Sequence, residues 1–311
     1  VAEGTLNGFN AKPGETKAAK IPFPAIPADD NADYHLNVKA LVIEGDDIIP
    51  SGHDAASEQF TLRSHQYPSD TDALWGAISD GEAKTAAAPV VEESDGFIDI
   101  TTPGNVKISF CKWNGDLSRY TIDGRSLMNT TLYPSFWRAM TDNDWGNNAH
   151  VRCNVWRYAA ENRRLMDFNH SVEGNKIIVR ELYRLPDVSS DYRLTYTVYP
   201  DGRIGVEASL IPDKDAQLPE MLRFGMIAAM PKPMENFSWY GRGPWENYSD
   251  RNTASFMGEW NAKVADMFYP YIRPQETGNH TDVRHASLTD ATGLGLRIDG
   301  VQPLNVTALD V

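Results

Sequence analysis

Apolar and polar side chains alternate along most of the chain, which is the pattern of strands that bury one face of a sheet. Residues 34–43 and 56–62 both follow this two-residue period. The three prolines of residues 21–27 remove hydrogen-bond donors, so this run is expected to be a loop or a sheet edge. Residues 1–64 therefore predict a small β-sandwich, which would be incomplete because too few strands are present.

The pattern changes in residues 65–89, which have no regular period and are rich in Ser, Asp, Ala and Gly. This composition predicts a linker. Within it, Trp75 is isolated among polar and small residues, so we expect its ring to pack against a neighbouring part of the molecule.

The strand pattern resumes at residue 90. The turn sequences Asn114-Gly115 and 200–203 each separate two alternating runs, so they predict two hairpins. The one helix candidate is residues 151–165, which carry a weak apolar stripe. Many strands with hardly any helix predict an all-β protein, in which residues 90–311 form a large antiparallel sandwich.

Composition and charge narrow the range of partners. The chain has 43 acidic and 29 basic residues and a formal net charge of -14, so neither nucleic acid nor an anionic membrane is an expected partner. No apolar run approaches the roughly 20 residues of a membrane-spanning helix. Two cysteines exclude a disulfide scaffold. The chain opens on Val1 without a signal peptide, so residues are expected to precede it. The sequence is compatible with a location in the cytoplasm or in the periplasm.

Polar and aromatic residues gather with glycine and proline in a few segments, the first of which is residues 136–148. Its Asp142, Asp144 and Gly146 match half of a calcium loop, but the third acidic position and the bidentate Glu are missing. Two other interpretations stay open. Asp142, Asn143 and Asp144 could fix a turn through side-chain hydrogen bonds, or the segment could be a loop that lines a sugar site.

The second segment, residues 239–251, combines glycine, aromatic and charged residues. Glu246, Asp250 and Arg251 are close enough in sequence to form a knot of ion pairs beneath Trp245 and Tyr248. The two glycines of its Gly-x-Gly run lack the third glycine and the following helix of a dinucleotide site.

The third segment, residues 268–278, ends close to Glu276. Two carboxylates about 5 Å apart would support retaining glycoside hydrolysis, and Glu246 and Glu276 are the pair to consider. Structural ion pairing is the preferred interpretation for both. The sequence has no Gly-x-Ser-x-Gly elbow, Cys/His metal cluster or phosphate loop.

Three ordered motifs in these segments resemble those of the large β-galactosidases of glycoside hydrolase family 2, at similar spacing. The motifs are Arg138-Ala-x-x-Asp142-Asn143-Asp144-x-Gly146, Gly241-x-Gly-Pro-x-Glu246-Asn-Tyr248-x-Asp250-Arg251 and Tyr269-x-Tyr-x-x-Pro-Gln-Glu276-x-Gly278. By this resemblance, residues 1–64 are the second half of the family's immunoglobulin-like fourth domain. Residues 90–311 are most of its fifth domain, a supersandwich of the galactose-mutarotase type.

The resemblance implies a retaining β-galactosidase whose two catalytic glutamates, with magnesium and sodium sites, lie in upstream parts absent from this chain. It therefore predicts no catalytic residue and no metal ligand here, and no activity for the chain alone. It also implies that the chain stops before the substrate-stacking Trp of the family, and that the enzyme is a homo-oligomer acting on β-galactosides.

The family's loop at Gly146, Asn147 and Asn148 borders the active site and moves as substrate settles, so these residues are expected on the substrate side. The residues after the glycine differ from the best-known member. A structural role is expected for the remaining motif residues, namely Arg138, Asp142, Asn143, Asp144, Glu246, Tyr248, Asp250, Arg251 and Glu276.

Two other functions remain open from the sequence. Aromatic residues such as Trp137, Trp145 and Trp245 would suit an independent carbohydrate-binding module. An epimerase-like enzyme would need an acid and a base, typically Glu and His. His285 is the histidine nearest in sequence to the two candidate glutamates.

Overall fold

The computed structural model describes residues 2–28 and 32–310, so residues 1, 29–31 and 311, including the outer ends of the two predicted domains, lie outside the described residues. The chain divides into two compact units, Val1–Gln66 and Tyr67–Val311. We describe each unit by itself.

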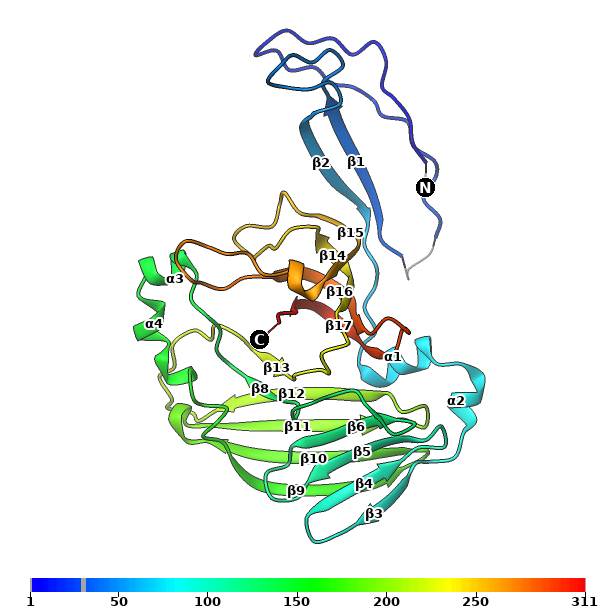
Figure 1. Ribbon diagram of the computed structural model, residues 1–311, viewed down its shortest axis with the longest axis vertical. Helices are drawn as coiled ribbons and strands as arrows, with labels where there is room; N and C mark the ends of the chain where they lie inside the picture. Colours follow the sequence, from blue (N-terminus) through cyan, green and yellow to red (C-terminus); the bar gives the residue numbers. More distant parts are fainter. Residues whose placement is uncertain (1, 29–31, 311) are drawn as a thin grey trace. The chain divides into compact units, whose positions relative to one another are not determined.

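The smaller unit contains one antiparallel hairpin, formed by β1 (Tyr34–Leu41) and β2 (Asp54–Arg63) (Figure 1). Both strands coincide with the two alternating runs of the sequence, which confirms the predicted strands. None of the described residues of this unit is fully buried. This hairpin is one element of the sandwich expected over residues 1–64. A single hairpin has little stability of its own in water.

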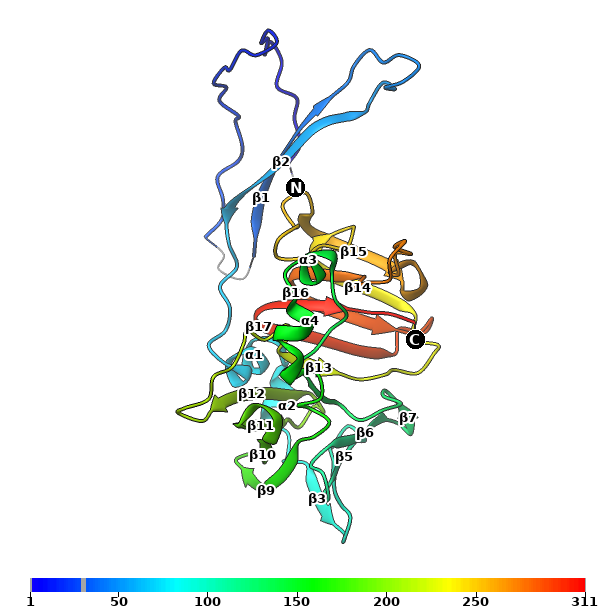
Figure 2. The ribbon, with the colours of Figure 1, turned by 90° about the vertical axis from the view of Figure 1, so that its left-hand side faces the viewer.

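The larger unit is built almost entirely from antiparallel strands, which confirms the all-β prediction. One sheet has the order β3-β4-β5-β6-β7, a second β12-β11-β10-β9, a third β15-β14-β16-β17, and β13 pairs with β8 (Figures 1 and 2). The strands are β3 (Val90–Glu93), β4 (Phe97–Thr101), β5 (Val106–Cys111), β6 (Leu117–Ile122), β7 (Arg125–Ser126), β8 (Tyr133–Ser135), β9 (Arg164–Glu173), β10 (Lys176–Leu185), β11 (Ser190–Val198), β12 (Ile204–Pro212), β13 (Gly225–Ile227), β14 (Asn236–Gly243), β15 (Phe256–Lys263), β16 (Asn279–Thr289) and β17 (Gly295–Thr307).

The first two sheets enclose the main core. Alternate residues of β4 and β5, such as Ile100 and Phe110, pack against alternate residues of β10 and β11, such as Val179 and Tyr196. The rings of Phe110 and Tyr196 lie 5.0 Å apart. A smaller apolar cluster, which includes Phe237, Trp239, Met267, Val283 and Ala286, lies at the β14–β17 sheet. The predicted sandwich thus follows directly from the two-residue period.

Both predicted hairpins are confirmed. Asn114-Gly115 lies between β5 and β6, and residues 200–203 lie between β11 and β12. The helix predicted for residues 151–165 does not form. Its place is taken by the end of α4 (Ala149–Arg152), the 3-10 turn η1 (Asn154–Trp156) and the start of β9. Of the supposed apolar stripe, Val155 and Tyr158 are exposed and only Ala159 is buried in the main core.

Residues 71–85, which the sequence pattern did not predict to be helical, form α1 (Thr71–Ile78) and α2 (Gly81–Thr85). Asp70 and Asp80 cap these helices by accepting hydrogen bonds from backbone N–H groups. Trp75 packs against a neighbouring part, as expected. Its ring stacks on Tyr199 with centroids 4.6 Å apart, and its Nε1 donates to Asp201 at 3.0 Å.

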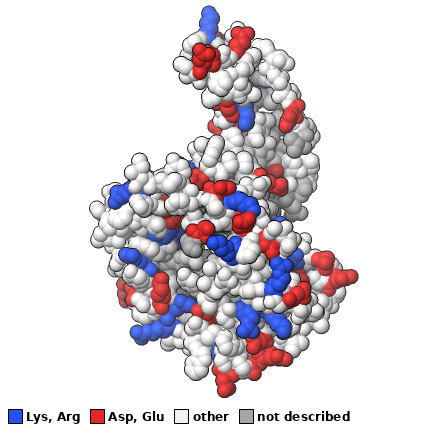
Figure 3. Space-filling model, viewed as in Figure 1, with Lys and Arg blue, Asp and Glu red and all other residues white. Residues whose placement is uncertain are grey.

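Three further short helical elements complete the larger unit: α3 (Asp142–Gly146), η2 (Pro186–Val188) and η3 (Val264–Asp266). In the part of the chain that the structure describes, no helix has the length and apolar character needed to cross a membrane. On the face drawn in Figure 3, basic and acidic side chains are interspersed.

Candidate functional site

The three motif segments, which are more than a hundred residues apart at the extremes, meet at one place in the larger unit. Asn143 Nδ2 donates to Asp250 at 2.8 Å, and the two residues are 107 apart in sequence. The backbone N–H of Asp142 donates to the Gln275 side chain at 3.0 Å. The backbone N–H of Gly278 donates to Glu246 at 2.8 Å. We call this convergence of residues 138–148, 244–251 and 269–279 the motif cluster.

The first segment is fixed by a capping box at the start of α3. Thr141 accepts a hydrogen bond from the backbone of Asp144, and the Asp144 carboxylate accepts one from the backbone of Thr141 at 2.8 Å. Arg138 forms an ion pair with the same carboxylate. Burial raises the pKa of Asp144, but the hydrogen bonds from Arg138 and Thr141 outweigh it and hold the pKa below its ordinary value. These contacts agree with the turn interpretation.

The same contacts leave Asp144 poorly suited to a calcium ion, because its carboxylate is already engaged. Across residues 2–28 and 32–310, no three His, Cys, Asp or Glu side chains come together in a way that could hold a metal ion. The magnesium and sodium sites that the sequence resemblance implies for a larger enzyme stay a prediction.

Glu246 is the centre of the motif cluster. One carboxylate oxygen accepts from the N–H of Gly278 and from the hydroxyl of Thr277 at 3.1 Å. The other accepts from Arg251 at 2.9 Å and from the hydroxyl of Tyr271. Burial raises the pKa of Glu246, but these four donors together lower it below its ordinary value. A carboxylate with every oxygen engaged in this way serves to hold segments together.

Glu276 is engaged separately. Its side chain pairs with Arg223 at 2.9 Å, and its backbone N–H donates to Met140 at 3.2 Å. Burial raises the pKa of Glu276, against the opposing effect of Arg223 and Arg138. Glu246 and Glu276 thus each have their own basic partner, which agrees with the structural interpretation that the sequence favoured.

The predicted knot of ion pairs needs one correction. Arg251 pairs with Glu246 and lies over the ring of Tyr248 at 5.4 Å, but Asp250 bonds Asn143 instead. Asp250 is thus the link to α3. Trp245 is 69% exposed, so most of its surface faces solvent. Sequence spacing alone could not show this, because the partner of Asp250 comes from a distant segment.

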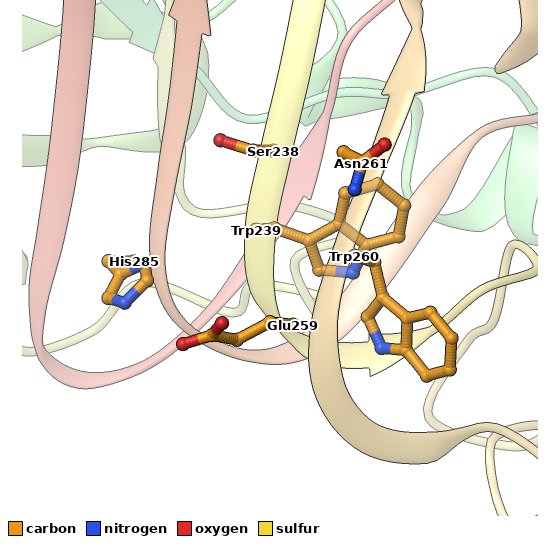
Figure 4. Close-up of a pocket in the computed structure, with 6 residues that line it drawn as sticks. All are labelled: Ser238, Trp239, Glu259, Trp260, Asn261 and His285. Carbon is orange, nitrogen blue, oxygen red and sulfur yellow. The ribbon is translucent and has the colours of Figure 1, made fainter.

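A second place with polar side chains is a pocket of about 380 Å³ lined by strands β15, β14 and β16 of the third sheet. Tyr240 pairs in register with both Glu259 on β15 and His285 on β16, so these two residues flank β14. Ser238 and Asn261 complete its polar lining. Figure 4 shows Glu259 and His285 extending to the same side of β14. Burial lowers the pKa of the His285 imidazole, and the nearby Arg297 lowers it further by a smaller amount.

This pocket bears on the two alternative functions. The rings of Trp239 and Trp260 turn away from Glu259 and His285 (Figure 4), and Trp260 donates to the Gly241 carbonyl at 3.1 Å. Both tryptophans nevertheless belong to the lining of the pocket, beside its hydrogen-bonding groups. His285 lies near Glu259 rather than near the two glutamates that the sequence suggested. The signal for Glu259 was its place in the alternating run of β15, which the sequence analysis did not use.

A comparison with protein families matches residues 102–311 to the family described as Beta galactosidase small chain. The match spans all three motif segments and more than half of the chain. The chain belongs to this family.

Relatives of this chain are named Beta-galactosidase, and their sequences are much longer. The Beta-galactosidase of Priestia megaterium is 30% identical over 302 residues, which are 97% of this chain and 28% of that protein. The Beta-galactosidase of Lactobacillus delbrueckii subsp. bulgaricus is 31% identical over 97% of this chain and 28% of its own length. Beta-galactosidase BgaC of Bifidobacterium adolescentis is 26% identical over 98% of this chain and 29% of its own length. The chain therefore spans less than a third of these relatives.

The predicted substrate-side loop connects α3 to α4. Gly146 is the last residue of α3, and a Cβ built there would meet nothing within 4 Å. The left-handed residue of the loop is Asn148, with φ at 59°. Arg152 Nη1 donates to the Asn147 carbonyl at 2.7 Å, and its Nε donates to Glu220 at 3.0 Å. Arg152, which belongs to α4, therefore holds the loop through these hydrogen bonds.

Replacing Arg152 by glutamine should loosen this loop without unfolding the unit. The Arg152–Glu220 pair is exposed, so its loss should change the free energy of unfolding only slightly. Amide hydrogen exchange of residues 147–152 should become faster, because the Asn147 carbonyl loses its donor. Arg180→Gln, which breaks an exposed pair on β10, is the control. Equal exchange in this segment for both variants would show that Arg152 does not hold the loop.

Proposed function

We propose that this chain is the part of a glycoside hydrolase family 2 β-galactosidase that borders the active site and supports assembly, while the catalytic carboxylates lie elsewhere in the polypeptide. The observation that carries the proposal is the motif cluster. Three segments that resemble the family's motifs are brought together by direct hydrogen bonds between Asn143 and Asp250, and between Glu246 and Gly278. Relatives named β-galactosidase are more than three times as long, which leaves ample length for a catalytic domain.

The carboxylates of the cluster support this division of labour. A retaining glycosidase needs one carboxylate free to attack the sugar and one free to donate a proton. Glu246 accepts from four donors, and Glu276 is paired with Arg223. The motif cluster would form one wall of an active site whose catalytic residues come from other domains. Those other domains are also proposed to bind the magnesium and sodium ions of the parent enzyme. The parent enzyme is proposed to be a homo-oligomer.

The loop Gly146, Asn147 and Asn148 is proposed to face the substrate. All three residues are exposed, and the loop stands at the edge of the motif cluster. The asparagine amides can both donate to and accept from sugar hydroxyls. In this conformation Gly146 is helical, and alanine is preferred over glycine in a helix by about 1 kcal/mol. A mobile loop in the parent enzyme would therefore be biased toward this conformation by Gly146→Ala.

The test compares this chain with the complete reading frame that encodes it. The chain alone should not hydrolyse a chromogenic β-galactoside, because the described residues 2–28 and 32–310 present no positioned pair of nucleophile and acid. The complete protein should hydrolyse it and release the β-anomer of galactose first, as a retaining enzyme does. Turnover by the purified chain would overturn the proposed lack of catalytic residues. A complete protein that leaves β-galactosides intact would overturn the proposed parent activity, and an α-anomer as first product would overturn retention.

A further inference from the structure

A group of ionisable side chains lies in the main core of the larger unit, away from the motif cluster. Glu181 on β10 is 4% exposed and Tyr183 on the same strand is 1% exposed. Asp116, just after the Asn114-Gly115 turn, forms an ion pair with Arg163, and both of these side chains are almost completely covered. The guanidinium of Arg163 lies 5.4 Å from the ring centre of Tyr183. Tyr192 and Tyr196 on β11 complete the titratable groups that face Glu181.

The hydrogen bonds of this group can be counted. The Tyr183 hydroxyl lies 2.9 Å from the Asn114 carbonyl oxygen and 2.9 Å from Oε2 of Glu181. A tyrosine hydroxyl has one hydrogen, and a carbonyl can only accept. If Glu181 were ionised, the single hydrogen would have to serve two acceptors. If Glu181 carries a proton, its own O–H donates to Tyr183 and the Tyr183 O–H donates to Asn114. Both contacts are then satisfied.

The charges lead to the same result. Asp116 and Arg163 neutralise each other, so an ionised Glu181 would add a second negative charge to the core without a second cation. Its other oxygen, Oε1, has no hydrogen-bond partner among the described residues. A buried oxygen without a partner is far more costly when charged than when neutral. Burial accordingly raises the pKa of Glu181 to about 8, and the pKa of Tyr183 lies above its ordinary value for the same reason.

The turn that Tyr183 holds has little room to adjust. Gly115 has a φ of 80°, and a Cβ built on it would lie 2.0 Å from the Tyr183 hydroxyl oxygen. The hydroxyl thus fits directly against the turn between β5 and β6. If Glu181 lost its proton, the Tyr183 hydrogen would be drawn toward the carboxylate and the bond to Asn114 would weaken.

We propose that Glu181 keeps its proton in the folded protein and that the chain Glu181–Tyr183–Asn114 is a pH-sensitive latch between β10 and the β5–β6 turn. The latch is closed while Glu181 is neutral. It loosens when the carboxyl group ionises, so that alkaline conditions weaken the contact between the two sheets of the main core.

The first test measures the free energy of unfolding of the whole chain as a function of pH for wild type and Glu181→Gln. Glutamine keeps the shape of the neutral acid and a donor for Tyr183. A carboxyl whose folded pKa exceeds its unfolded value stabilises fully below the unfolded pKa, and this stability is lost as pH rises toward the folded value. From about pH 5 to about pH 8, the unfolding constant of wild type relative to the variant should rise about tenfold per pH unit.

Glu92→Gln, at an exposed position of β3, is the control and should show no such trend relative to wild type. A pH-independent difference between wild type and Glu181→Gln would overturn the proposal. Infrared spectroscopy of the wild type reports the protonation of Glu181 directly. This second measurement can be made even if Glu181→Gln does not fold. Wild type at pH 6 should show the C=O band of a protonated carboxylic acid, which is lost near pH 8 and shifts in Tyr183→Phe. A missing band, or one that ignores Tyr183→Phe, would equally contradict the latch.

Discussion

Replacing Phe136 by alanine is expected to lower the free energy of unfolding of the larger unit by about 3–5 kcal/mol. Phe136 is 1% exposed. Its ring meets Tyr192 edge-on at 5.3 Å, Trp156 at 6.2 Å and Phe224 at 6.0 Å. Truncation would leave a cavity among three other aromatic rings, which cannot close around it without losing their own contacts. Because Arg138 follows two residues later, the change should also disturb the start of the motif cluster.

Urea unfolding of the whole chain, followed by tryptophan fluorescence, measures this effect. Phe97→Ala removes the same side chain at a position that is 42% exposed and should cost less than half as much. Phe136→Leu should recover much of the loss, because it refills most of the volume. Similar midpoints for Phe136→Ala and Phe97→Ala would mean that Phe136 does not anchor the core.

Replacing Glu246 by glutamine is expected to destabilise the larger unit by about 3 kcal/mol. A buried donor that loses its acceptor costs about 1–3 kcal/mol, and Tyr271, Thr277 and Gly278 all donate to this carboxylate. Arg251 adds less, because its side chain is 60% exposed. The glutamine amide would also turn a donor toward groups that are donors themselves, such as the Gly278 N–H. The side chain of Glu246 is only 12% exposed, so water cannot fully replace these bonds.

The effect should depend on pH in a defined direction. The pKa of Glu246 lies below its ordinary value of 4.5, so its stabilisation is present above that value and is lost as pH falls through the lowered pKa. Wild type and Glu246→Gln should therefore differ most near pH 7 and converge in acid. Glu235→Gln, whose partner Lys263 is exposed, is the control and should change stability by less than about 1 kcal/mol. A difference that stays constant down to pH 3 would contradict this role for Glu246.

The elements that sequence analysis predicted correctly are those fixed by local chemistry. The hairpin at Asn114-Gly115 needs only two alternating runs and a turn that tolerates a positive φ at Gly115. Helices α1 and α2 were missed because they are short and have weak apolar faces. One contact that secures α1 is the stacking of Trp75 on Tyr199, a residue just after β11 that no local pattern could supply.

The candidate site was predictable to a similar extent. The order of the motifs indicated which residues belong together, but not the contacts among them. The bond from Asn143 to Asp250 depends on how two distant segments cross. Glu181 was overlooked for the same reason, because its strand alone does not show that a second sheet covers it. Residues that gain their environment from non-adjacent strands cannot be placed from alternation alone.

The wide separation of the motif segments has a consequence for the synthesis of the protein. The hydrogen bonds that join α3 to the other two segments span 107 and 133 residues. Contacts that close such long stretches form late in folding, since the chain must first be ordered in between. On the ribosome the β5–β6 hairpin can form early, whereas Glu246 has no N–H of Gly278 to bind until that residue has emerged. The surface proposed to face the sugar is therefore expected to be among the last parts of the unit to take shape.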